Sequence, residues 1–360
     1  MAVVTKTIGT ATRDYSTMGL WEADLDDAGI YSAGDDAVGE CYDDSQFSEL
    51  CYINGGRTVG LSTVLLTVAV GERHDGTSAG SGANITNPSH STFYIGRVNT
   101  TVEWLKSVYV GNGGDHAFRL LSTADDSVIR NCYSLQDTST DCDYGYRIGN
   151  STTGSAIINC MAVSGNTTDP SRCFMGNEDG EFLNCTAWGG FNGFRQDGND
   201  SGSRMVIKNC IAMNATSLTF HEFGSAFGVW GTGTDYNLSD DGYAPGGNSL
   251  INKDNTTQFV STVAASEDLH LIAGSDAIGA GVDLGTTPTN IEFDIDNEDR
   301  TGEVWDIGGD QLLSVGGGGF TPLTRRKHNR RKTTSGKRSS LHRLGTKVRG
   351  TSNKKGIRRF

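Results

Sequence analysis

Carboxylates recur in several polar stretches of the chain, and they are the first side chains that could do chemistry. The candidates are Asp125, Asp126, Glu178, Asp179, Asp197 and Asp200. If these stretches are equivalent turns, their carboxylates line one edge, where they could bind Ca²⁺ or act as the acid and base that cleave a glycosidic bond. The favoured alternative is that Asp and Asn populate turns because they bond to nearby backbone and tolerate left-handed geometry.

Three arginines form a second group with a common position. Arg119, Arg147 and Arg195 each directly follow an aromatic residue. Facing outward, they would make a stripe that suits the anionic groups of uronic or sulfated sugars. The favoured alternative pairs these arginines with the neighbouring acidic turns.

Metal ligands are sparse in this sequence. None of its eight cysteines lies in the Cys-x-x-Cys pair typical of zinc sites. Asp294 and Asp296 partly resemble a calcium loop, but the sharp-turn glycine and the distant Glu of an EF-hand are missing. His221 and Glu222 are expected to be a surface or loop pair. We therefore expect no cofactor, and Ca²⁺ stays possible at Asp294 and Asp296, as it does at the acidic turns.

The elements that must position these side chains are revealed by an internal repeat. Four segments align without gaps on an Asn-Cys pair, and the Asn recurs at intervals of 28, 25 and 25 residues. The pairs are Asn131 and Cys132, Asn159 and Cys160, Asn184 and Cys185, and Asn209 and Cys210. Small or aliphatic residues alternate with mixed ones on either side of each pair, which predicts two short strands that meet at an Asn-containing turn.

A third element precedes each Asn-Cys segment and carries an aromatic column. Its members are Phe118, Tyr146, Phe174 and Phe194, spaced 28, 28 and 20 residues apart. Each repeat therefore holds about three strands, and stacked repeats share one continuous core. We expect the four Asn side chains to stack as an amide ladder and the four Cys side chains to pack inward. Local disulfides between Cys41 and Cys51 or between Cys132 and Cys142 are the alternative for the cysteines.

These features resemble the pectate-lyase-like superfamily of right-handed parallel β-helices, over roughly residues 5 to 310. In character the chain is closest to the β-helix proteins of bacteriophage tailspikes and virions. The resemblance implies an all-β solenoid with a short N-terminal capping helix, expected near Met18–Leu25 with Ser16 as its N-cap. Pectate lyases use an Arg base beside Ca²⁺-binding Asp residues, but no local motif here matches those roles.

The chain divides into four parts by composition and repeat. Residues 1–90 are expected to be the N-terminal cap and first coils, 91–245 the central coils, 246–315 the closing segment, and 316–360 a Gly linker with a basic tail. The tail contains 15 Lys and Arg and no acid, which leaves 15 basic against 43 acidic residues before it. Such asymmetry is typical of an arm that binds nucleic acid, an acidic protein or another polyanion. A flexible tail with no partner is the alternative.

The tail's binding candidates are its paired and tripled basic residues. They are Arg325, Arg326, Lys327, Arg330, Arg331, Lys332, Lys337 and Arg338. No apolar run reaches the roughly 18 residues that span a bilayer, so no membrane partner is expected. The first residues also lack the apolar stretch of a secretory signal.

Three functions from different classes follow from these observations. The first is a structural or glycan-binding component of a bacteriophage virion, a fibre, spike or capsid-decoration protein whose basic tail anchors it to virion proteins. The resemblance implies a homotrimer on the surface of the particle. The second is a polysaccharide lyase or glycoside hydrolase that acts through the turn carboxylates, and the third is a non-catalytic carbohydrate-binding protein, secreted or at the cell surface. Catalysis is left undecided, with a binding role preferred.

Overall fold

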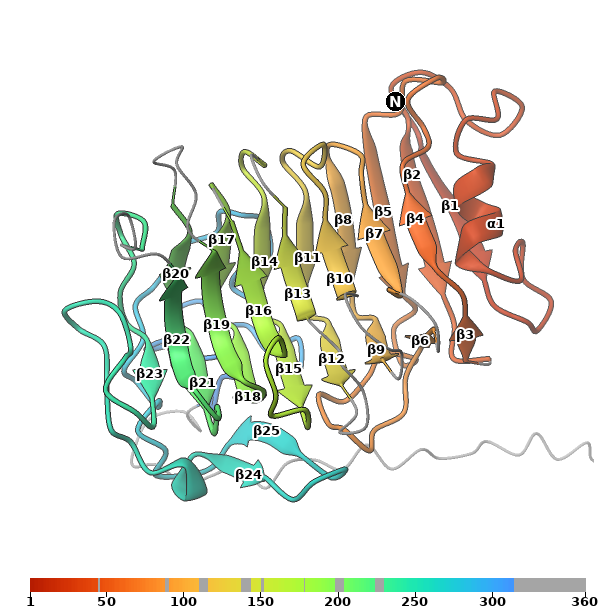
Figure 1. Cartoon of the computed structure of the whole chain (residues 1–360). Coiled ribbons are helices and arrows are strands. Elements are labelled where there is room, and N and C mark those ends of the chain that lie inside the picture. The colour runs from red at the N-terminus through yellow and green to blue at the C-terminus, as the bar shows by residue number, and fades with distance from the viewer. Residues whose placement is uncertain are drawn as a thin grey trace, which may run out of the picture. The chain divides into compact units, whose positions relative to one another are not determined.

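The chain is built almost wholly of short strands that pair in parallel (Figure 1). A computed structural model describes residues 1–44, 46–87, 91–109, 116–136, 144–149, 152–177, 179–197, 204–223 and 230–313. The candidates Glu178 and Asp200, the basic tail and Cys142 therefore lie outside the described residues. No helix in the described ranges is long and apolar enough to cross a membrane.

Three long sheets run the length of the solenoid. Sheet A contains β1 (Val3–Ile8), β2 (Asp36–Cys41), β5 (Thr63–Val68), β8 (Thr100–Glu103), β11 (Val128–Arg130), β14 (Ala156–Ile158), β17 (Glu181–Leu183) and β20 (Val206–Lys208). Sheet B contains β3 (Phe47–Ser48), β6 (Asn84–Thr86), β9 (Lys106–Tyr109), β12 (Tyr133–Gln136), β15 (Met161–Ser164), β18 (Thr186–Gly189), β21 (Ile211–Met213) and β23 (Leu238–Ser239). Sheet C contains β4 (Cys51–Ile53), β7 (Phe93–Ile95), β10 (His116–Leu120), β13 (Tyr144–Ile148), β16 (Arg172–Gly176), β19 (Asn192–Asp197) and β22 (Leu218–Phe223).

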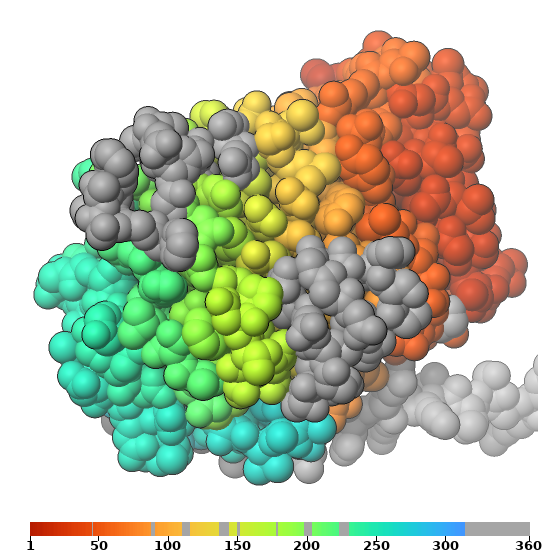
Figure 2. Space-filling view, viewed as in Figure 1, coloured from red at the N-terminus to blue at the C-terminus, as the bar shows by residue number. Residues whose placement is uncertain are grey.

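Each central coil visits the three sheets in turn, as β10, β11 and β12 do, and the next coil repeats the path one strand further along. The result is the right-handed parallel β-helix that the repeat predicts, and its coils form successive bands of colour in the space-filling view (Figure 2). Parallel stacking pairs every strand with its neighbours in the adjacent coils, which leaves unpaired edges only at the ends.

The turn between sheets A and B explains the recurring asparagine. Asn131, Asn159, Asn184 and Asn209 all have φ between 51° and 52°, in the left-handed region. Asn tolerates this conformation better than most residues because its short polar side chain can bond locally. The sharp turn then directs the following cysteine into the core. Cys132, Cys160, Cys185 and Cys210 are fully buried, and none of the seven described cysteines forms a disulfide, including Cys41 and Cys51.

The aromatic column forms a continuous stack inside sheet C. Tyr146 lies 5.2 Å from Phe118 and 4.8 Å from Phe174, measured between ring centroids, with the rings within 8° of parallel. Phe194 lies 4.6 Å from Phe174, and Phe220 extends the column at 5.1 Å from Phe194. Because the repeat places one ring in each coil, the offset stack adds pair energy to the burial of apolar surface.

A short helix, α1 (Met18–Ala23), packs against the first coils with Met18 and Trp21 buried. Its N-cap is Thr17, whose side chain accepts from the amide of Leu20 at 3.1 Å, so the expectation of Ser16 was wrong by one residue. Trp21 packs on Gly39 of β2, where a Cβ would lie 2.8 Å from the indole ring. The close packing of α1 on β2 therefore requires a glycine at position 39.

After β23 the chain turns back and covers the outside of the coils. This segment includes the 3₁₀ helix η1 (Asn255–Thr257) and the antiparallel pair β24 (Phe259–Ser261) and β25 (Asp268–Leu271). Its apolar side chains, among them Phe259, Leu269 and Ile295, join Tyr133, Met161 and Trp188 of sheet B in a second core cluster. The outward residues of sheet B, which the repeat suggested would be a mixed outer face, are therefore buried.

Candidate functional site

The outer face of sheet C carries most of the side chains that could bind a ligand. The strand register places the predicted arginines in one row with other polar and aromatic residues. This central row is Tyr52, Tyr94, Arg119, Arg147, Met175, Arg195 and His221. One residue comes from each strand of the sheet, so successive members lie about 4.8 Å apart along the solenoid.

A second row begins the same strands and contacts the first. It consists of His116, Tyr144, Arg172 and Asn192. The guanidinium carbons of Arg147 and Arg172 lie 5.2 and 5.5 Å from the ring centroid of Tyr144, so both rows face the same side. The sequence interpretation missed this row, although each member precedes an aromatic-column residue by two positions.

Aromatic rings dominate the N-terminal end of the central row. Tyr52 and Tyr94 meet edge to face with centroids 6.2 Å apart, and Arg119 lies over Tyr94 at 5.8 Å. Arg119 makes no hydrogen bond or ion pair with any described residue, and its buried Nε has no partner. Its guanidinium is therefore available for an anion, with a tyrosine surface beside it.

His116 is held neutral in the middle of the face. Its ring stacks on Tyr144 at 4.8 Å, and its Nε2 accepts a hydrogen bond from Arg147 Nη1 at 3.1 Å. The proton must then be on Nδ1, because a guanidinium can only donate. Burial, followed by repulsion from Arg119 and Arg147, lowers the pKa of His116 to about 2.

The C-terminal end of the face combines two arginines with two carboxylates. Arg195 Nε donates to Asp197 at 2.6 Å, and Arg172 Nη2 donates to Asp169 at 2.7 Å. Both arginines are more than nine-tenths buried, while the Asp169 side chain is 57% exposed. Burial first, and then the charge of Arg195, lower the pKa of Arg172 from its ordinary value. The pKa of His221 is lowered by burial and by both arginines.

Charge on this face is unbalanced among the described residues. Four arginines from the two rows face two carboxylates, Asp169 and Asp197. Part of the alternative interpretation thus holds, since Arg195 pairs with a predicted acid, whereas Arg119 does not. The arrangement can bind a repeated anionic group and stack flat rings, and it brings no cluster of metal ligands together in the described part of the sheet.

The described acidic turn residues do not gather into one site. Asp126 and Asp179 occupy equivalent left-handed positions, with φ of 53° and 45°, two coils apart and so roughly 10 Å from each other at the backbone. The coil between them has Gly154 at that position. Asp125 accepts from the amide of Thr153 at 2.8 Å, and Asp197 lies on the sheet face instead. These contacts are those of turn residues.

The expected amide ladder is formed only in part. Asn209 Nδ2 donates to Asn184 Oδ1 at 3.1 Å, which is the one Asn-to-Asn bond among the described residues. The side-chain amides of Asn131, Asn159 and Asn184 donate to carbonyl oxygens of residues 291–294. The Asn turns therefore also hold the returning C-terminal segment in place.

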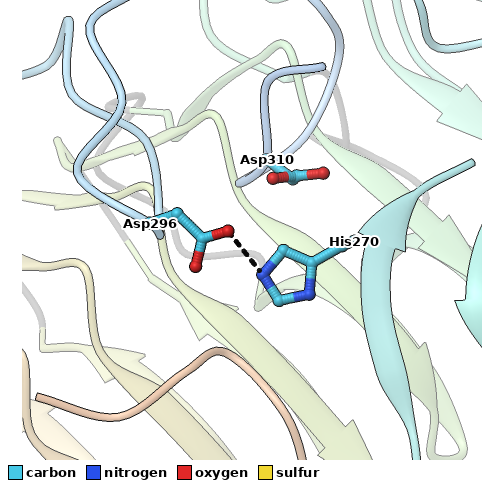
Figure 3. A group of neighbouring side chains, drawn as sticks. All are labelled: His270, Asp296 and Asp310. Atoms are coloured by element: carbon cyan, nitrogen blue, oxygen red, sulfur yellow. Dashed lines mark ion pairs between the residues drawn. The ribbon is translucent and has the colours of Figure 1, made fainter. Parts of the chain in front are cut away.

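The two residues of the expected calcium site, Asp294 and Asp296, lie in different surroundings in the structure. Asp294 is fully buried, and its oxygens accept from the backbone amides of Asp296, Glu298 and Gln311 at 2.7 to 3.0 Å. Asp296 is exposed and faces His270 instead, beside Asp310 (Figure 3). The sequence interpretation did not single out His270 or Asp310 as site residues, because they come from separate stretches of the chain.

No protein-family model and no curated protein sequence matches the chain. Among solved structures it is similar to a pectate lyase, with 13% identity and a TM-score of 0.45 over 86% of this chain and 96% of that one. A pectin methylesterase from Aspergillus niger covers 62% of this chain and 68% of its own, with 16% identity and a TM-score of 0.41. A pectin methylesterase in complex with a hexasaccharide has 9% identity and a TM-score of 0.35. Similarity at this level says nothing of the activity of this chain.

Proposed function

We propose that this chain binds an anionic polysaccharide along the outer face of sheet C. The observation that carries the proposal is the unpaired guanidinium of Arg119 between Tyr94 and Arg147, in a face where described arginines outnumber carboxylates. Guanidinium groups bind carboxylates and sulfates through two parallel hydrogen bonds. Tyrosine rings offer flat apolar surfaces with a polar edge, which suits a sugar ring.

The stacked geometry suits a polymer better than a small molecule. The first four members of the central row come from successive coils and are at least partly exposed, whereas Met175 and Arg195 are buried. A chain of repeating sugars can therefore meet side chains at a regular spacing along those four coils. The rigid sheet also holds these side chains in place before binding, which reduces the entropy lost on association. Because guanidinium groups bind carboxylates and sulfates, the proposed ligand is a polysaccharide of uronic acids or of sulfated sugars.

The test compares acidic and neutral polysaccharides by isothermal titration calorimetry on the full chain. Polygalacturonate or a sulfated glycan should bind, with affinity falling as salt rises, and a neutral glucan should not. Arg119→Gln should weaken binding about tenfold, because it removes a charge-assisted contact. Arg13→Gln is the control, since Arg13 is a partly exposed arginine paired with Asp44 on another part of the surface. Equal affinity of the two variants would exclude the sheet C face.

Cleavage of the bound polysaccharide is a second candidate, and the surroundings of Arg172 favour it. Burial and the charge of neighbouring Arg195 lower the pKa of this arginine, although the contact with exposed Asp169 acts in the opposite direction, and this makes Arg172 a better base than an ordinary arginine. A lyase would release unsaturated ends from an acidic polysaccharide, with or without Ca²⁺, and Arg172→Lys should abolish their absorbance. If binding occurs without new chain ends, the protein is a non-catalytic carbohydrate-binding protein.

The virion role expected from the sequence stays a proposal beside this one. A stiff solenoid that binds surface glycans would serve a fibre, spike or decoration protein, as a trimer on the particle. The tail that would anchor it to an acidic partner lies outside the described residues. Imaging of particles tests the position and symmetry, and deletion of residues 321–360 should remove salt-dependent binding to DNA or to the particle.

A further inference from the structure

Three side chains from separate stretches of the C-terminal segment converge beside sheet B (Figure 3). His270 lies in β25, Asp296 follows a buried turn, and Asp310 comes near the end of the described chain. One ligand atom from each lies within 4.8 Å of the others. His270 and Asp310 are buried, with 4% and 6% exposure, while Asp296 is open to solvent. The cluster thus has one accessible side.

The ring of His270 is oriented by a carboxylate outside the group. Its Nδ1 bonds to Asp268, two residues earlier on the same strand. Its Nε2 then points to Asp296 Oδ2 at 3.3 Å. A carboxylate on one ring nitrogen fixes the tautomer and leaves the other nitrogen as a ligand, which is the usual arrangement behind a metal-bound histidine.

Asp310 supplies an independent indication of a ligand. One of its oxygens accepts from the amide of Leu271 at 2.7 Å, and no described residue donates a hydrogen bond to the other. The side chain is nevertheless more than nine-tenths buried and faces His270 and Asp296. A charged carboxylate in so buried a position is costly unless a positive charge lies beside it.

We propose that His270 Nε2, Asp296 and Asp310 bind a zinc ion, with water as the fourth ligand. A tetrahedral ion with bonds of about 2.0 Å separates its ligand atoms by about 3.3 Å, which is the distance between His270 Nε2 and Asp296 Oδ2. Asp310 must approach slightly to complete the set. A nitrogen ligand favours zinc over calcium or magnesium, which prefer oxygen alone.

The site would join parts of the segment that are far apart in the sequence. β25, the Asp294–Asp296 turn and the stretch at Asp310 all belong to the segment that packs on sheet B, where Leu269, Leu271 and Ile295 are buried. A shared ion would hold these three stretches together, so metal binding adds to the stability of the folded chain. This role does not depend on polysaccharide binding.

The experiment uses the full chain after treatment with EDTA and dialysis. Calorimetric titration with zinc chloride near pH 7 should show about one ion bound to the wild type. Asp296→Asn should weaken this binding at least about tenfold, because it removes one of three protein ligands. Asp299→Asn is the matched control, since Asp299 is exposed on the same stretch and its side chain, among the described residues, accepts only from Thr301. It should bind zinc within about twofold of the wild type.

A thermal measurement checks that the loss is not a folding defect. At the same concentration, zinc should raise the melting temperature of the wild type and of Asp299→Asn, and should raise that of Asp296→Asn clearly less. The exposure of Asp296 makes this variant mild, whereas His270→Gln could disturb the packing. No zinc bound by the wild type, or equal binding by the two Asp variants, would overturn the site. His270 would then be an ion-pair partner of Asp268 and Asp296 only.

Discussion

Two buried histidines are neutral in the folded protein, and both make it sensitive to acid. His74 accepts from the amide of Gly76 through Nδ1 at 3.2 Å and donates to the carbonyl of Asn131 through Nε2 at 2.9 Å. Burial lowers its pKa to about 4, and that of His116 is lowered to about 2. In the unfolded chain each histidine has its ordinary pKa of about 6.5. Between that pH and the lower pKa of the folded form, the unfolded chain is protonated and the folded protein is not.

We therefore expect stability to fall as pH drops through the window from about 6.5 to about 4. His74 alone contributes a slope of about 1.4 kcal/mol per pH unit in that window, because the unfolded chain binds one more proton than the native one. Urea unfolding of the wild type and of His74→Gln at pH 7.5, 5.5 and 4.5 measures this. The difference between the two should shrink as pH falls, and parallel losses would contradict the assignment.

The asparagine turns combine a backbone conformation with a side-chain bond. Asn184 has φ of 51° and donates to the carbonyl of Ile291 at 3.4 Å, while exposed Asn214 has φ of 59°. We expect Asn184→Ala to cost about 2 to 3 kcal/mol, since the left-handed conformation costs 1 to 2 kcal/mol for an alanine and a buried bond is lost. Asn184→Gly should cost less. Asn214→Ala should lose mainly the free energy that comes from the left-handed backbone conformation. If urea unfolding showed the same cost at both sites, the side-chain hydrogen bond of Asn184 would contribute nothing measurable.

At the scale of the element, sheet C depends on its continuous aromatic stack. Phe174 has a stacked ring on each side, at 4.8 and 4.6 Å, and an edge contact with Phe182 at 5.6 Å. We expect Phe174→Ala to reduce the free energy of unfolding by about 3 to 5 kcal/mol, because it opens a cavity in the middle of the column. Phe174→Leu should cost clearly less. A loss below 1 kcal/mol for Phe174→Ala in urea titration would mean that the coils collapse to fill the space.

At the scale of the whole described chain, the returning C-terminal segment completes a second core. The outward side chains Tyr133, Met161, Trp188 and Ile211 of sheet B are buried, and Trp188 meets Phe259 edge to face at 5.9 Å. A chain ending at residue 245 would uncover Met161, Trp188 and Ile211, whereas Tyr133 would keep its contacts with His74 and Ser78. Each contributes about 1.5 to 3 kcal/mol when buried, so their sum rivals the stability of a typical domain, about 5 to 15 kcal/mol.

We therefore expect the chain of residues 1–245 to aggregate or to melt far below the full chain. The chain of residues 1–313 keeps every described contact and serves as the control. Size-exclusion chromatography and thermal unfolding distinguish the two. A stable, monodisperse 1–245 chain would show that the coils fold without the C-terminal segment and that this segment adds little to their stability.

Because of the repeat, the strands, turns and core positions of the coils could be predicted from the sequence alone. Strands, Asn turns, inward cysteines and the aromatic column recur at nearly constant spacing because every coil places equivalent residues in equivalent surroundings. Period-two alternation also placed Arg119, Arg147 and Arg195 on the outside. It could not place His116 there, because the consecutive residues Ala117 and Phe118 both belong to the core, which breaks the alternation within the strand.

Only the tertiary structure decided the parts that lack a repeat. The sequence gives no period to the segment after residue 246, so its return over sheet B, its bonds to the Asn turns and the meeting of His270, Asp296 and Asp310 could not be derived. Such contacts depend on the sum of many packing interactions between distant segments, which local patterns do not encode. The sequence thus determined the solenoid and the arginine row, and the fold decided which side chains meet there and beside sheet B.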